Sequence, residues 1–413
     1  MLRDLWGQAY GAMVYNRRRT TITIIGMAWG IATVVLLLAY GAGFGRAIEA
    51  IFAQWGTQLI GVFPGRTSEQ AGGTKAGVQV RFTQDDLDRL WNTAPNLQHV
   101  SPMLSKNVPV ANELHTYTWS VNGYRPDIQD ILKLDIDSGR FFTDLDDQQR
   151  SHVAVIGSEA KTKLFSGQYA IGQRIRLNGI SFTVIGVLKP KMQEGDDDDN
   201  NRQVDIPFNT MGDIKDLKYL DGIWMNYTGD HMIVEQAIRN TLAAAHNFRP
   251  SDHNAIFVAN LMEQLKQFRI IIIALQILLL FIGGLTLGIA GIGLMNIMLV
   301  AVQQRTREIG IEKALGARKK HILIQFLAEA LVITGVGGAI GIVLAYAVAI
   351  GVGRITFYSA LASNAEAADI RLLISPAIVL VATGILIVVG MVSGMIPAIK
   401  AANLNPIEAL RYE

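Results

Sequence analysis

The chain has 413 residues, of which half are hydrophobic and 17% are charged, and it contains 40 glycines and no cysteine. Charged residues make up about a quarter of an ordinary soluble protein, and the acidic residues here crowd the middle third, so the composition argues against a row of soluble domains. The lack of cysteine excludes a disulfide framework, a thiol nucleophile and a thiolate metal site, while the net charge of +2 indicates little because the segments differ in sign.

The N-terminal segment, residues 1–20, is predicted to form a cytoplasmic amphipathic helix that leads into a first membrane span, residues 21–45. The span is uncharged from Ile22 to Gly45, which is long enough for a hydrocarbon core of about 30 Å. A cleaved signal peptide is the alternative, and the length of the apolar run disfavours it. The apolar stripe that places the first helix along the inner leaflet consists of Leu2, Leu5, Trp6, Ala9 and Met13.

Residues 46–269 have the composition of a water-soluble mixed α/β domain, inserted after the first span. Asn178 and Gly179 join two alternating runs and predict a β-hairpin with a type I′ turn, because both central residues of that turn need positive φ. Thr83 and Asp86 predict a capping box at the start of a helix. The other expected elements are a strand at 153–156, a helix capped by Ser158, a helix at 234–246, a strand at 255–258 and a loop over 67–77.

The inserted domain carries no recognisable catalytic or metal-binding pattern. The run Asp196–Asp199 invites a calcium interpretation, but Asn201 and Pro207 stand where an EF-hand needs its glycine and its bidentate glutamate. The seven histidines show no metal-ligand spacing, and no G-x-S-x-G motif occurs. We therefore expect no catalytic residue, metal or cofactor in this chain, and a binding or docking role for the domain.

Three further spans follow the domain. Glu329, near one end of the third span, is the one charged residue within them, and charges are costly at the centre of a bilayer. Pro397 should end or kink the fourth span. Between the third and fourth spans lies a short loop, residues 354–371. The spans themselves are residues 270–302, 322–353 and 372–398.

Small residues recur at every fourth position in the third and fourth spans. This spacing creates a helix face along which another backbone can approach closely, and we expect it to serve packing within a larger, dimeric assembly. Ordinary tolerance of glycine in membrane helices is the alternative. The positions are Gly337, Gly341, Ala345, Ala349 and Gly353 in the third span and Gly390 and Gly394 in the fourth.

The loop of residues 303–321 is predicted to contain a short amphipathic helix at the membrane surface, with Gly316 as its C-terminal cap. Binding to anionic lipid would account for its basic residues but not for Glu308 and Glu312, which such a surface would repel. Mixed charge favours a protein partner. In the tail, residues 399–413, a second short helix is expected over 407–412.

The basic residues near the ends of the spans predict the orientation of the chain. Twelve arginines and lysines lie before the first span, in the 303–321 loop and after the fourth span, whereas the 354–371 loop has only Arg354 and Arg371. Both termini and the 303–321 loop are therefore expected in the cytoplasm, and residues 46–269 outside it.

The run of residues 295–317, MNIMLVAVQQRTREIGIEKALGA, resembles the signature of the MacB/FtsX-like ABC transporter permeases, also called type VII ABC transporters. Residues 16–20 and 397–412 look like the same family's entry to span one and its tail, and residues 139–188 are similar to its periplasmic core domain. The resemblance covers essentially the whole chain. It implies a multi-pass protein of the bacterial inner membrane, with four transmembrane helices and a large mixed α/β (α+β) periplasmic domain between helices one and two.

The resemblance also implies a mechanism. In such permeases the loop between spans two and three forms a coupling helix in a groove of a cytoplasmic ATPase, whose ATP-driven closure moves the outer domain, a mode called mechanotransmission. The sequence contains no P-loop, so ATP and Mg are expected in a separate ATPase chain and this permease is expected not to be an enzyme. The coupling role then falls on Arg305, Thr306, Arg307, Glu308, Ile309, Gly310, Ala314, Leu315 and Gly316.

The leading functional prediction is the permease subunit of an efflux or export system, with a second permease copy or paralogue, a periplasmic adaptor and an outer-membrane channel as further partners, and no nucleic acid. The alternatives are a membrane-anchored scaffold or regulator of a periplasmic partner such as a cell-wall hydrolase, and a lipoprotein-releasing permease. A secondary transporter is disfavoured, because no inverted repeat or intramembrane ion site is found. The substrate, the choice between homodimer and heterodimer, and the cargo surface stay open.

Overall fold

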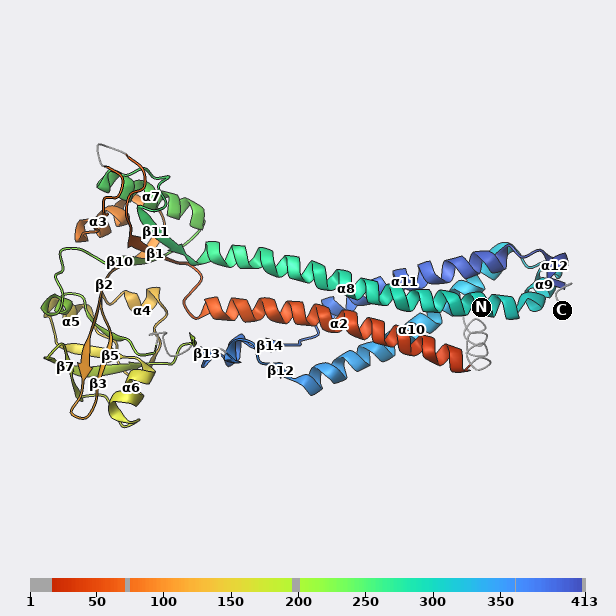
Figure 1. Ribbon diagram of the computed structural model, residues 1–413, viewed down its shortest axis with the longest axis horizontal. Coiled ribbons are helices and arrows are strands. Elements are labelled where there is room, and N and C mark those ends of the chain that lie inside the picture. The colour runs from red at the N-terminus through yellow and green to blue at the C-terminus, as the bar shows by residue number, and fades with distance from the viewer. Residues whose placement is uncertain (1–16, 71–74, 195–200, 361, 411–413) are drawn as a thin grey trace. The chain divides into compact units, whose positions relative to one another are not determined.

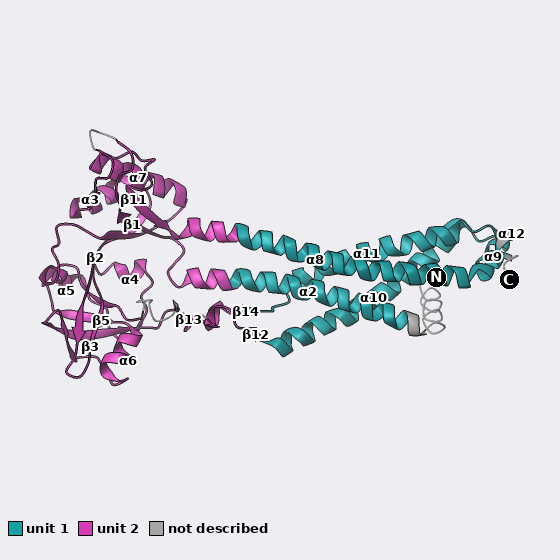
Figure 2. Ribbon diagram, in the orientation of Figure 1, with its two compact units in different colours: residues 1–46, 270–355, 370–413 teal, residues 47–269, 356–369 magenta. Residues whose placement is uncertain are grey.

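A computed structural model describes residues 17–70, 75–194, 201–360 and 362–410 of the chain (Figure 1). Residues 1–16 of the predicted N-terminal helix and the acidic run Asp196–Asp199 lie outside these residues. The chain divides into two compact units (Figure 2). We call residues 1–46, 270–355 and 370–413 the helical unit, and residues 47–269 and 356–369 the sheet unit.

Within the described residues, four helices are long and apolar enough to cross a membrane. Their ends differ from those of the predicted spans, because the helical backbone continues beyond the apolar run at both ends of α2 and α8, at the start of α10 and at the end of α11. Helix α11 begins later than predicted, with Pro376 at its start and Ser375 as its cap, since the Ser375 hydroxyl accepts from the Ile378 amide at 3.3 Å. The helices are α2 (Arg17–Ala53), α8 (Leu261–Gln304), α10 (Lys319–Val352) and α11 (Pro376–Ala402).

Helix α11 does not end at Pro397. It runs on to Ala402, although a proline removes one backbone hydrogen bond from a helix interior. Pro397 itself is buried, and Ala398, Ala401 and Ala402 after it are also buried. Packing around this last part of the helix therefore outweighs the local preference of proline.

The small residues of the third and fourth spans pack within the chain. A Cβ added to Gly337 would lie 2.8 Å from the Cβ of Met27 on α2, and one added to Gly394 would lie 2.6 Å from that of Ala330 on α10. These glycines allow α2, α10 and α11 of one chain to approach each other, and the expected role of this face in a larger, dimeric assembly stays a prediction. Of the other predicted positions, Gly341 lies against α2, Gly390 lies against Thr334, Ala345 and Ala349 are buried, and Gly353 ends α10 with φ of 64°.

In the described part of the sheet unit, ten strands form one sheet in the order β11-β1-β10-β2-β3-β9-β5-β7-β4, with β6 pairing β2 and β7. Most neighbours are antiparallel, and β3–β9 and β5–β7 are parallel. The strands are β1 (Leu59–Pro64), β2 (Leu97–Ala111), β3 (Thr116–Tyr124), β4 (Ile136–Gly139), β5 (Val153–Ile156), β6 (Arg174–Leu177), β7 (Ile180–Leu188), β9 (Val204–Pro207), β10 (Gly222–Tyr227) and β11 (Ile256–Asn260).

Helices cover this sheet and close its core, which includes Leu90 of α3, Val121 of β3 and Ile238 of α7, all fully buried. The helices are α3 (Gln84–Thr93), α4 (Ile128–Ile131), α5 (Asp144–Gln148), α6 (Ser158–Phe165) and α7 (His231–His246). Short two-stranded ladders pair β8 (Gln193–Glu194) with β13 (Ala362–Ser363), and, in the helical unit, β12 (Arg354–Ile355) with β14 (Ile370–Arg371).

The predicted hairpin is confirmed: β6 and β7 pair with Leu177 opposite Ile180, and Asn178 and Gly179 have φ of 50° and 87°. The predicted cap at Ser158 is wrong, because Gly157 takes the cap position. The first amides of α6 are satisfied from elsewhere, since those of residues 159 and 160 donate to the Asn201 carbonyl at 2.9 and 3.1 Å.

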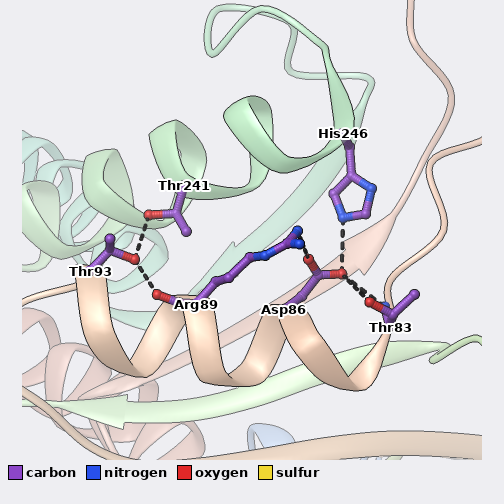
Figure 3. A network of polar contacts seen from close by, with 6 residues as sticks. All are labelled: Thr83, Asp86, Arg89, Thr93, Thr241 and His246. Carbon is purple, nitrogen blue, oxygen red and sulfur yellow. Dashed lines mark hydrogen bonds and ion pairs between the residues drawn. The ribbon is translucent and has the colours of Figure 1, made fainter.

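A polar network joins α3 to α7 (Figure 3). The fully buried Asp86 accepts from the Thr83 amide at 2.8 Å, which confirms the predicted capping box. The same carboxylate lies 2.9 Å from Nε2 of His246, at the end of α7, and 3.3 Å from Nη1 of Arg89. Burial opposes ionisation of Asp86, but the bonds from His246 and Thr83 outweigh it and place its pKa below the usual value.

Candidate functional site

The predicted coupling helix is present as α9 (Thr306–Ala314), between α8 and α10. Its C-terminal end is closed by Gly316, whose φ of 98° suits glycine. The amides of Gly316 and Ala317 donate to the carbonyls of Lys313 and Glu312 at 3.1 and 3.0 Å. The chain can therefore turn sharply from α9 into α10 with these helix-end carbonyls satisfied.

The inner face of α9 is buried within the helical unit. Ile309 is 3% exposed and belongs to a cluster with Val302 of α8 and Ile322 of α10. Gly310 faces α12 (Pro406–Leu410), where a Cβ added to it would lie 2.8 Å from the Cβ of Ala409. Only glycine lets the two helices approach this closely without a shift of one of them.

An ion pair connects the start of α9 to the membrane helix α10. Nη1 of Arg305, the residue just before α9, lies 3.2 Å from Oε2 of Glu329. Their side chains are 26% and 12% exposed, so both charges are largely withdrawn from solvent. Removing either partner would leave the other charge without a compensating ion.

A second polar contact connects the end of α9 to the end of α11. Nζ of Lys313 donates to the carbonyl of Ala402 at 2.8 Å and to that of Leu404 at 2.5 Å. Carbonyls at a helix C-terminus lack intrahelical partners and carry partial negative charge, so an ammonium group suits them. Partial burial and, secondly, the nearby Lys319 lower the pKa of Lys313.

The outer face of α9 is exposed and combines apolar with charged side chains. Ile311 is 44% exposed and Leu315 is 85% exposed, and Arg307, Glu308 and Glu312 beside them are exposed as well. An open groove of about 480 Å³ runs from Glu312 and Leu315 to residues at the start of α10, among them His321 and Gln325. Apolar side chains edged by charges of both signs suit a protein partner better than an anionic lipid surface.

The nine predicted coupling residues thus fall into two groups. One group holds α9 in place within the chain, and consists of Arg305, Thr306, Ile309 and Gly310. The other is exposed, and consists of Arg307, Glu308, Ala314, Leu315 and Gly316. The structure brings both groups together on one short helix, and their roles in coupling stay predictions.

Sequence reasoning missed Ile311, Lys313 and Glu329 as members of this site. The spacing of Arg307, Ile311 and Leu315 at every fourth residue is a signal that could have placed Ile311 on the exposed face. The partners of Lys313 and Glu329 come from other helices, which the spacing within one segment does not show. Over the described ranges, no group of three or more His, Asp or Glu residues is arranged to hold a metal ion.

Comparisons with known proteins cover both units. The model of the MacB-like periplasmic core domain matches residues 20–240, and that of the FtsX-like permease C-terminal matches residues 270–406. The macrolide export ATP-binding/permease protein MacB of Bdellovibrio bacteriovorus is 31% identical over 98% of this chain and 61% of its own length. The pyoverdine export ATP-binding/permease protein PvdT of Pseudomonas putida is 31% identical over 98% of this chain and 59% of its own length.

The chain thus spans about 60% of the length of these curated relatives. MacB of Chlorobaculum tepidum is 33% identical over 98% of this chain and 61% of its own length. Among solved structures, the periplasmic region of MacB from Actinobacillus actinomycetemcomitans aligns with a TM-score of 0.44 and 20% identity, covering 54% of this chain and 97% of that one.

Proposed function

Because this chain belongs to the family of MacB/FtsX-like ABC transporter permeases, we propose that it couples ATP hydrolysis by a cytoplasmic ATPase to movement of its periplasmic domain. The chain is a multi-pass membrane protein with a large periplasmic domain. The proposal places both termini and α9 in the cytoplasm, in agreement with the basic residues near the ends of the spans.

One observation carries this proposal: one face of α9 is fixed to its own chain, and the other exposes apolar and charged side chains of the kind that bind a protein partner. Ile311 and Leu315 lie on the exposed face. Arg305 and Lys313 hold the two ends of the helix to Glu329 and to the end of α11. A partner bound at Leu315 could therefore displace α9 only together with α10 and α11, which is what a coupling element requires.

The direction of transport and the other partners are also part of the proposal. The relatives' names specify export of a macrolide and of pyoverdine, which supports an export role here. We include a second permease copy or paralogue, a periplasmic adaptor and an outer-membrane channel as partners. ATP and Mg would be bound by the ATPase, since this sequence has no P-loop.

The test separates binding of the ATPase from coupling to it. Leu315→Asp should reduce co-purification of an ATPase with the detergent-solubilised permease about tenfold, because an exposed apolar side chain that the partner would cover becomes a charge. Glu329→Gln should retain the ATPase but lower ATP-dependent export, because it alters the connection to α10 and leaves the exposed face intact. The matched control is Leu145→Asp, which changes a 61% exposed leucine of the sheet unit.

Two results would contradict the proposal. If no ATPase co-purifies with the wild-type protein, the energy source is wrong. If Leu315→Asp and Leu145→Asp retain the ATPase equally well, the docking surface on α9 is wrong.

A further inference from the structure

A groove of about 730 Å³ lies in the sheet unit, beside helix α7. One face of α7, the loop that follows it and the first turn of α8 form its walls. The residues that matter for its chemistry are Met232, Glu235, Arg239, Arg249, Pro250 and Glu263. Neither the predicted coupling nor the fold of the sheet accounts for a groove with two arginines in its wall.

Arg239 is the unusual residue of this groove. Its side chain is only 10% exposed, and its Nε donates to Oε1 of Glu235 at 2.9 Å. Its Nη1 is buried and has no hydrogen-bond partner among the residues that the structure describes. A guanidinium group carries five N–H donors, and leaving a buried charged donor without an acceptor is unfavourable.

The neighbouring acidic residue accepts from other groups and does not accept from Nη1 of Arg239. Glu235 also accepts from Nδ2 of Asn260 at 2.9 Å through Oε2, so both of its oxygens are engaged. The same Nδ2 lies 3.3 Å from Nδ1 of His231. Nε2 of His231 is likewise buried and unpartnered within the described part of the chain.

The rest of the groove can be reached from outside. Arg249 is 62% exposed, and its ion pair with Glu69 at 3.3 Å is exposed too, so it contributes little stability and can be exchanged for another anion. Met232 is 62% exposed and, with Pro250, adds an apolar part to the wall. The groove thus offers a nearly buried guanidinium, a second, exposed one and an apolar surface.

We propose that this groove binds a ligand that carries one carboxylate group and an apolar substituent. The carboxylate pairs with Arg239 and Arg249, because a guanidinium binds a carboxylate through paired charge-assisted hydrogen bonds, and the apolar part lies against Met232 and Pro250. Glu235 and Glu263 in the same wall disfavour more highly charged anions such as phosphate, since repulsion grows with the charge of the ligand. This site goes beyond the proposed coupling function and does not depend on an ATPase.

The test uses the full-length protein in detergent and ligand-detected NMR with three probes: N-acetyl-leucine, its uncharged amide and inorganic phosphate. The acid should bind at least about tenfold more tightly than the amide, as expected for a charge-assisted contact. Arg239→Gln and Met232→Glu should each weaken binding of the acid by a similar factor. The matched control is Arg174→Gln, an exposed arginine of β6 outside the groove, which should bind the acid like the wild type.

Several results would overturn this assignment. They are equal binding of acid and amide, absence of binding by all three probes, and tighter binding of phosphate than of the acid. Since Arg239 is buried, Arg239→Gln could impair folding, which thermal unfolding would detect. Met232→Glu changes an exposed residue, so it tests the groove without altering a buried side chain. If this variant folds and binds the acid like the wild type, the groove is not the site.

Discussion

The ion pair between Arg305 and Glu329 offers the sharpest test of how α9 is connected to the membrane helices. Glu329→Gln keeps the size and shape of the side chain but removes its charge, and it leaves Arg305, 26% exposed, without a carboxylate partner. Arg305→Gln makes the reciprocal change. The double variant removes both charges together, so that neither is left unpaired.

The distance between the two atoms sets the size of the expected effect. At 3.2 Å, two unit charges attract each other by about 5 kcal/mol at an effective dielectric constant of about 20. Desolvation of the two groups offsets much of this attraction. We therefore expect each single variant to lower the free energy of unfolding by about 2–4 kcal/mol, and the coupling energy of the pair to be about 1–3 kcal/mol.

The assay is a double-mutant cycle, measured as equilibrium unfolding in mixed detergent micelles with a rising fraction of SDS. Glu312→Gln is the control for loss of a glutamate in this region, because Glu312 is exposed on α9, and it should change stability by less than about 0.5 kcal/mol. A coupling energy below about 0.5 kcal/mol would refute the view that this ion pair fixes α9 to α10.

Three further predictions concern packing and titration. Gly310→Leu should lower the unfolding midpoint by displacing α12, whereas Gly284→Leu, where an added Cβ meets nothing within 4 Å in the described residues, should be tolerated. Burial raises the pKa of Asp205 to about 7, so between about pH 4 and 7 the folded state keeps a proton on this carboxyl that the unfolded state has lost, and the free energy of unfolding falls as pH rises from about 4 to 7. Asp205→Asn should therefore raise the free energy of unfolding at pH 8 by about 1–4 kcal/mol in denaturant unfolding. The pKa of Asp86 is lowered in the folded state, so its ionised carboxylate stabilises the fold above its unfolded-state pKa, and this contribution is lost as pH falls through the folded-state pKa. Asp86→Asn should therefore lower the free energy of unfolding at pH 7 and flatten its decrease below about pH 4, in acid titrations followed by circular dichroism.

Features that depend on a few neighbouring residues were predictable from the sequence. The Asn178-Gly179 turn needs two positive φ values and has them, and the capping box at Thr83 and Asp86 lies within four positions. The place of α9 was also predictable, because Gly316 favours a helix end and the residues before it favour a helix.

Features that depend on distant segments were not predictable. Asn201 supplies the carbonyl that replaces the expected Ser158 cap, and the carbonyls that Lys313 contacts at the end of α11 belong to residues 89 and 91 positions further along the chain. The groove beside α7 is of the same kind. A single sequence shows Arg239 as one basic residue of a predicted helix, and only the folded chain shows that its Nη1 has no acceptor among the described residues.

The polar contacts at the two ends of α9 determine what this helix can do when a partner pushes on it. Apolar packing such as that of Ile309 is not directional and would tolerate sliding, but hydrogen bonds weaken steeply once their geometry is lost. A slide of one residue along a helix axis is about 1.5 Å, enough to break the contact of Lys313 with the Leu404 carbonyl at 2.5 Å and that of Arg305 with Glu329 at 3.2 Å. If a partner binds at Leu315 as we propose, a force on this exposed face would therefore act on α10 and the end of α11 together, and a joint movement of these helices would cost less than a slide of α9 between them.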